Sequence, residues 1–163
     1  MWLIFTILIL ILAVIFAYLI RTGIFYKVQI RTGAPSLDTI CLAYKFYKGS
    51  YSEIYLAFKN LNSTVKLSSN FKPLGIYYDD PELVIKGKQR YAIGIILNNS
   101  DLSVDADLEE LMVKNDYNIV WITKINHAVL TEFPSKTFLS LIWSVKTVYP
   151  KLKEFIKVCF VLI

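Results

Sequence analysis

Residues 2–21, WLIFTILILILAVIFAYLIR, decide how this chain is organised. From Trp2 to Ile20 there is no charged residue, no proline and no glycine, and Arg21 ends the run. A helix of this length extends about 28 Å, close to the roughly 30 Å hydrocarbon core of a bilayer. The sequence therefore predicts a transmembrane signal anchor over residues 1–21. The residues that mark its two ends are Trp2, Leu3, Ile20 and Arg21.

A cleaved signal peptide is the main alternative for this segment. Such a peptide has a basic start, an apolar core of about 7–15 residues and a small-x-small cleavage site. Here only Met1 precedes the apolar run, and the run ends in Phe16-Ala17-Tyr18-Leu19-Ile20-Arg21. The length and the flanks favour an uncleaved anchor.

The basic residues near the span predict its orientation. Arg21, Lys27 and Arg31 follow it and no basic residue precedes it, and basic flanks tend to stay in the cytosol. We therefore expect the following domain to face the cytosol. Two glycosylation sequons, at Asn62 and Asn98, would be used only in a luminal domain, and such tripeptides are common by chance.

Composition favours one anchored domain. The chain has 163 residues and a formal net charge of +5, which favours proximity to anionic lipid head groups. It has no Lys/Arg run or RNA-binding aromatic motif, so we expect no nucleic-acid partner. Cys41 and Cys159 have no metal-type spacing and are expected to be buried, reduced thiols. We expect no cofactor and no metal.

The hydrophobic pattern predicts an α+β domain. Residues 22–38 are expected to form a membrane-proximal stalk with a weak first strand at 27–30, and residues 39–163 to form the domain. The order strand, short loop, helix occurs at residues 43–61 and again at 128–148, roughly 85 residues apart, which suggests two strand-helix-strand-strand repeats. Expected strands are 39–47, 74–78, 91–97, 117–123 and 128–133; expected helices are 51–61, 105–115 and 136–149, the last interrupted by Pro150.

Several blocks of the chain also carry a resemblance to a known family. They are Ala43-Tyr44-Lys45-Phe46, Tyr77-Tyr78-Asp79-Asp80-Pro81, Ala92-Ile93-Gly94-Ile95-Ile96-Leu97 and Phe133-Pro134 followed by Ser140-Leu141-Ile142-Trp143. In this order after an apolar helix, they resemble the testis-expressed reticulophagy (ER-phagy) receptor family of animals. The domain of that family is similar to the GyrI-like fold, a duplicated strand-helix-strand-strand unit.

The resemblance implies a single-pass protein of the endoplasmic reticulum (ER) membrane that acts as an adaptor in selective autophagy of that organelle. It also implies a possible nuclear-envelope role, in which the family is thought to bring a valosin-containing AAA ATPase and a metalloprotease to trapped topoisomerase. Both are protein-binding roles.

The chain departs from the family in two respects. It has no acidic tail with the aromatic-x-x-aliphatic motif that binds autophagy modifiers, and Tyr51–Ile54 and Tyr117–Val120, which match the bare pattern, are expected in a helix and a core strand. A second repeat would also need two strands after the final helix. Another chain could complete the sheet, the edge could stay open, or the C-terminus could be truncated, which we favour.

A membrane-bound small-ligand binder or hydrolase of the GyrI-like type is the alternative. The small residues Ala43, Gly75, Ala92 and Gly94 would leave space over one sheet face, although close helix packing also explains them. The lone histidine, His127, has no nucleophile at a recognisable spacing, so no catalytic residue is expected. The residues of such a groove would be Tyr44, Phe46, Tyr77, Trp121 and Glu132.

Overall fold

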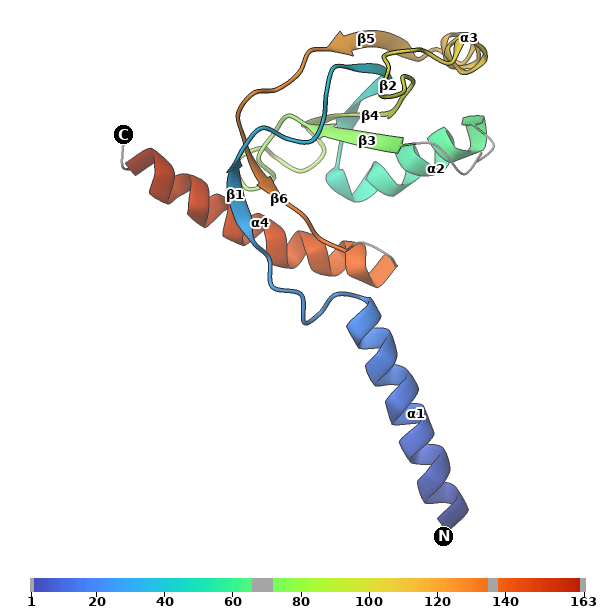
Figure 1. The fold of residues 1–163 in the computed structure, drawn as a ribbon, viewed down its shortest axis with the longest axis vertical. Helices are drawn as coiled ribbons and strands as arrows, with labels where there is room; N and C mark the ends of the chain where they lie inside the picture. Colours follow the sequence, from blue (N-terminus) through green and yellow to red (C-terminus); the bar gives the residue numbers. More distant parts are fainter. Residues whose placement is uncertain (1, 66–71, 135–137, 162–163) are drawn as a thin grey trace. The chain divides into compact units, whose positions relative to one another are not determined.

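The computed structural model describes residues 2–65, 72–134 and 138–161, and these fall into two units (Figure 1). One unit contains Met1–Pro35 and Asn126–Ile163, and the other contains Ser36–Ile125. Each unit has its own antiparallel sheet. The region expected as one domain, 39–163, is therefore distributed over both units.

The unit Ser36–Ile125 is built on a four-stranded sheet in the order β3-β4-β2-β5. All three strand pairs are antiparallel, as expected for an α+β domain. The strands are β2 (Ile40–Gly49), β3 (Lys72–Tyr77), β4 (Gln89–Ile96) and β5 (Asn118–Ile122).

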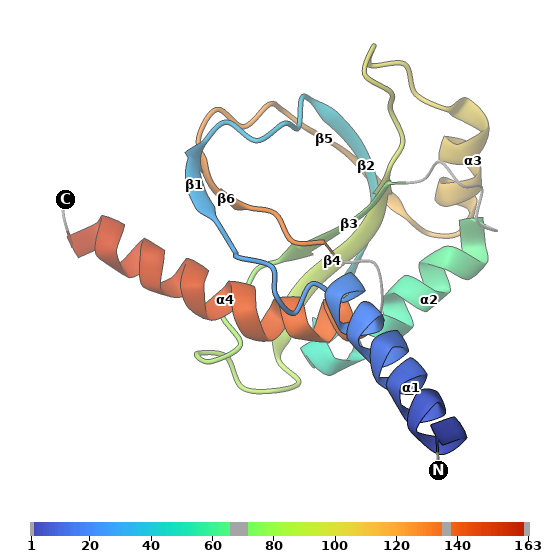
Figure 2. The ribbon, with the colours of Figure 1, turned by 60° about the horizontal axis from the view of Figure 1, so that its bottom comes forward.

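Helices cover one face of this sheet. A 3-10 turn, η1 (Tyr51–Glu53), leads directly into α2 (Ile54–Val65), and α3 (Ala106–Lys114) follows β4. Figure 2 shows α2 and α3 on the same side of the sheet, where both contribute to one apolar core. Its most deeply buried large side chains are Leu61, Ile93, Ile95 and Met112.

Capping side chains set the starts of these helices. Ser50 accepts a hydrogen bond from the Ser52 amide at 3.3 Å, and Asp105 accepts one from the Leu108 amide at 3.0 Å. Each satisfies an amide that the first helical turn leaves without a partner. The first turn after Ser50 is 3-10, and α2 continues to Val65 rather than ending at the expected residue 61.

The other unit contains the helix α1 (Trp2–Arg21) and the helix α4 (Phe138–Val161). Its two strands, β1 (Ile30–Gly33) and β6 (Ala128–Thr131), form an antiparallel ribbon that contacts α4. The first strand was expected at 27–30. It lies three residues later, where Arg31 and Thr32 pair with Leu130 and Val129.

The expected end of the last helix at Pro150 is wrong, because α4 runs through Pro150 to Val161. Proline lacks the amide that would bond to the carbonyl of Lys146, a loss that usually ends or bends a helix. Here Pro150 lies on the exposed side of α4, where water can satisfy the freed carbonyl.

One strand-helix-strand-strand unit is present as β2–α2–β3–β4. The candidate for a second unit begins with β6 and α4, but β6 pairs with β1, and β5 joins the four-stranded sheet. Within the ranges that the structure describes, no strand follows α4. A GyrI-like arrangement of two repeats therefore stays a prediction.

Candidate functional site

The helix α1 is the first candidate functional element. No residue of this helix is buried, and Trp2 and Leu3 are 87% and 73% exposed. Of the helices in the described residues, α1 is the one long and apolar enough to cross a membrane. An apolar helix with no buried residue is compatible with membrane anchoring.

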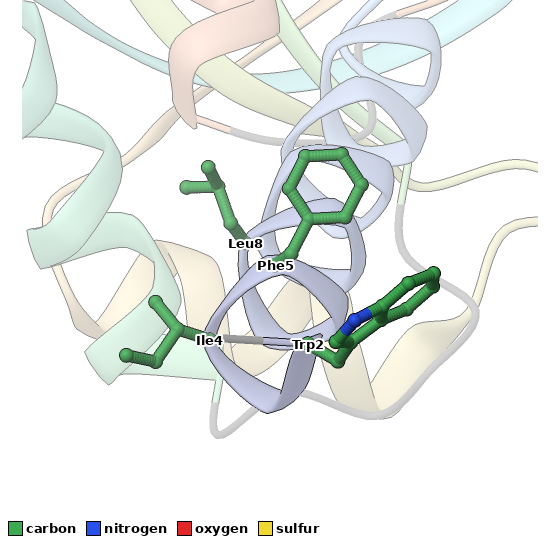
Figure 3. Close-up of a pocket in the computed structure, with 4 residues that line it drawn as sticks. All are labelled: Trp2, Ile4, Phe5 and Leu8. Carbon is green, nitrogen blue, oxygen red and sulfur yellow. The ribbon is translucent and has the colours of Figure 1, made fainter.

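Figure 3 shows the apolar side chains at the start of α1. Trp2, Ile4, Phe5 and Leu8 line an open depression of about 510 Å³. All four come from α1 itself, so lipid chains would fill the spaces between them in a bilayer. The depression is therefore a feature of the surface of α1 itself.

The aromatic residues expected to line a ligand groove lie on two different faces of the sheet. Directly paired residues of an antiparallel sheet share a face. Tyr44 and Phe46 pair with Gly94 and Ala92, on the face away from the helices. The other two candidates lie on the helix-covered face: Tyr77 pairs with Tyr91, and Trp121 pairs with Cys41.

The small residues that suggested a groove are also divided between the faces. Ala43 and Gly75 lie on the helix-covered face, and Ala92 and Gly94 on the other. At Gly94 the reason for a small residue is clear, since an added Cβ would overlap the carbonyl oxygen of Ala43 in the neighbouring strand. Close approach of two backbones explains this glycine without a ligand.

Glu132 lies in the other unit, just after β6. Its carboxylate accepts a hydrogen bond from the Arg31 guanidinium at 2.9 Å. The two side chains are 67% and 78% exposed, so the pair stabilises the β1–β6 ribbon only weakly.

A polar cluster at the base of the β3–β4 loop is the most elaborate side-chain arrangement in the unit Ser36–Ile125. The Tyr51 hydroxyl donates to the Asp79 carbonyl at 2.8 Å and accepts from the Asp79 amide at 3.1 Å. The Asp79 carboxylate accepts from the Arg90 guanidinium at 2.7 Å and from the Arg90 amide. The hydrogen bonds from Arg90 lower the pKa of Asp79, whose side chain is only 7% exposed. Both ends of the loop are therefore fixed.

The loop between these ends presents apolar side chains to solvent. Leu83 is 81% exposed and Ile85 is 69% exposed. The Asp80 carbonyl accepts from the amides of Leu83 and Val84, which gives the loop a defined turn. A pair of exposed aliphatic side chains on an anchored loop fits a protein-docking element. Sequence reasoning interpreted this region only as a turn and missed both residues, because exposure cannot be derived from a short apolar run.

The aromatic residue of each aromatic-x-x-aliphatic match has a structural role. Tyr51 lies in the 3-10 turn and holds the loop base, as described. Tyr117 is 5% exposed and packs in the core, where burial raises its pKa. The second match continues into the edge strand β5, where Val120 is 38% exposed, so the expected core placement holds for Tyr117 and not for Val120.

The lone histidine and the two cysteines differ in their exposure to solvent. His127 is exposed just before β6. Cys41 is buried, and burial raises the pKa of its thiol, while Cys159 is partly buried. No group of three His, Cys, Asp or Glu side chains could hold a metal within the described ranges.

Comparison with known proteins finds two that are similar to this chain in sequence. No family model matches the chain, and no solved structure matches it. Human testis-expressed protein 264 is 29% identical over 148 residues, which are 91% of this chain and 46% of that protein. The mouse homologue is 30% identical over 136 residues, which are 83% of this chain and 43% of that protein. The chain thus spans less than half the length of these curated relatives. Similarity over most of its residues supports homology of this chain to the testis-expressed protein 264 family.

Proposed function

We propose that this chain is a single-pass membrane adaptor whose helix α1 crosses the bilayer and whose remaining residues face the cytosol. The observation that carries the proposal is an apolar helix of 20 residues in which no residue is buried. Such a helix would be insoluble in water unless lipid covered it. Arg21, Lys27 and Arg31 favour the cytosolic orientation because they follow the span closely.

The family relationship extends the proposal to a location and a process. The resemblance to the reticulophagy receptor family supports the ER membrane, with the nuclear envelope as a further site, and a role in selective autophagy of the ER. We do not propose binding of autophagy modifiers through the two candidate motifs, because Tyr51 lies in a 3-10 turn and Tyr117 is buried in the core.

Protein binding, rather than catalysis, is the activity that we propose for the domain. The aromatic candidates for a ligand groove lie on opposite faces of the sheet, which gives little support to a small-ligand binder or hydrolase. The exposed side chains of Leu83 and Ile85 offer a docking element instead. The family resemblance suggests a valosin-containing AAA ATPase as one partner.

A binding measurement with the purified ATPase tests this proposal. The full chain, held in lipid nanodiscs, is expected to bind the ATPase, and Leu83→Asp is expected to weaken binding by at least tenfold because one desolvated aliphatic contact is worth about 1.5–3 kcal/mol. Leu56→Asp is the matched control, since Leu56 is 56% exposed on α2. Absence of binding by the unaltered chain would refute this partner, and equal loss in both variants would refute the role of the loop.

A further inference from the structure

The helix α4 carries an exposed apolar stripe beside a row of lysines. Val145, Tyr149 and Ile156 are 52%, 49% and 38% exposed. Their spacings of four and seven residues place them on one side of the helix, within about 40° of one another at about 100° per residue. The same geometry places Lys146, Lys153 and Lys157 about 80° further round the helix.

The other side of α4 packs within its own unit. Val148 is 9% exposed, Ser140 is fully buried, and α4 contacts both strands of the β1–β6 ribbon. The helix is therefore fixed by its buried side, and the apolar stripe is held outward. Two exposed aliphatic residues and a tyrosine bordered by lysines form the pattern of a helix that lies in a membrane interface.

Side-chain contacts connect the end of α1 to the segment that leads into α4. Gly23 follows α1 with a φ of +77°, and an added Cβ there would lie 3.1 Å from the Pro134 ring and 3.2 Å from the Phe133 ring. The rings of Tyr26 and Phe133 meet edge to face, with centroids 5.5 Å apart. Since Phe133 and Pro134 come just before α4, these contacts hold the beginning of α4 close to the point where α1 ends.

We propose that the stripe Val145, Tyr149 and Ile156 docks on the anionic surface of the same bilayer that α1 crosses, with the lysine row on lipid phosphates and carboxylates. This inference rests on the membrane anchor of the proposed function. The positive charge of α4 favours anionic lipid as the binding partner of the stripe, because α4 contains four lysines and one glutamate. Docking would give the unit that contains α4 a second attachment to the membrane. Each lysine near an anionic surface contributes about fivefold to the docked population.

Site-specific labels test the docking. The full chain, with Cys41→Ser and Cys159→Ser, carries an environment-sensitive fluorophore at Ile156→Cys or at Val158→Cys and is reconstituted in phosphatidylcholine–phosphatidylserine vesicles containing a lipid-borne quencher. Val158 is 55% exposed and is the matched control, since it lies two residues away and about 160° round the helix. We expect quenching at position 156 and not at 158. The double variant Lys146→Gln/Lys157→Gln should reduce the docked-to-undocked ratio about 25-fold.

A third label distinguishes failure of the docking from failure of the anchor. A fluorophore at Leu10→Cys, in the middle of α1, is quenched if α1 is in the bilayer. Quenching at position 10 with equal signals at 156 and 158 overturns the docking alone. No quenching at position 10 overturns the anchor, and the docking with it. Quenching at 156 that persists in pure phosphatidylcholine and in the lysine variant overturns the anionic character of the surface.

Discussion

Replacing Tyr51 by phenylalanine removes one oxygen that serves the base of the exposed loop. This hydroxyl donates to the Asp79 carbonyl at 2.8 Å and accepts from the Asp79 amide at 3.1 Å. The ring contacts of Tyr51 with Tyr77 and Tyr91 need no hydroxyl and are retained. A partly buried amide left without a partner costs about 1–2 kcal/mol, which corresponds to a roughly 5–30-fold change in an equilibrium constant.

Amide hydrogen exchange measures this change. In the full chain held in nanodiscs, the Asp79 amide of Tyr51→Phe should exchange about 5–30 times faster than in the unaltered chain. The Leu61 amide in α2 should change less, because the opening is local. Tyr55→Phe is the control, since Tyr55 is 63% exposed on α2. Equal exchange of the Asp79 amide in the two variants would refute the role of the Tyr51 hydroxyl.

Three further predictions concern the unit Ser36–Ile125. Gly94→Ala should destabilise the sheet by at least about 3 kcal/mol, because the new Cβ would overlap the backbone of β2; an unchanged denaturation midpoint would refute this close approach. Leu61→Ala should cost about 2–5 kcal/mol in the same unfolding assay, whereas Leu56→Ala, at an exposed site, should change stability little. The Asp79–Arg90 pair should stabilise the loop base above the ordinary aspartate pKa of about 3.9 and lose that contribution as pH falls through the lowered pKa of Asp79. The protection of the loop amides, corrected for the pH dependence of their intrinsic exchange rates, should therefore fall on acidification, and Asp79→Asn should remove that part of the pH dependence.

Local signals in the sequence predicted many of the elements. The helix α1 follows from its uninterrupted apolar run, and α3 follows from Asp105 as its cap and acidic residues in its first turn. Both features act within a few residues, so they can be derived without knowledge of the fold. The antiparallel α+β class also follows from the alternation of apolar residues in the strands.

The division of residues between the two sheet faces could not be predicted. The alternation within β2 was predicted, with Ala43 on one face and Tyr44 on the other, but placing Ala92 relative to Ala43 also needs the pairing register. A shift of one residue moves every side chain of a strand to the other face. Apolar side chains lie on both faces of these strands. The sequence pattern alone therefore does not determine the register in which the strands pair.

The exposure of the β3–β4 loop and the full length of α4 depend on tertiary structure. Exposure of Leu83 follows from the fixed ends of its loop, and those ends depend on Tyr51, which lies 28 residues away from Asp79 in sequence. Continuation of α4 through Pro150 depends on packing of residues such as Val148 on the β1–β6 ribbon. Such packing can outweigh the cost of a proline, which sequence reasoning takes as a helix end.

The membrane topology of the full chain is the most direct test of the account. Intact microsomes containing the chain are treated with protease, and the glycosylation state is measured with a glycosidase. The account predicts digestion of the domain from outside and no glycan at Asn62 or Asn98. The amide of Asn98 already donates to the Thr39 carbonyl at 3.1 Å. A protected domain that carries glycan at either sequon would contradict the cytosolic orientation and the adaptor function with it.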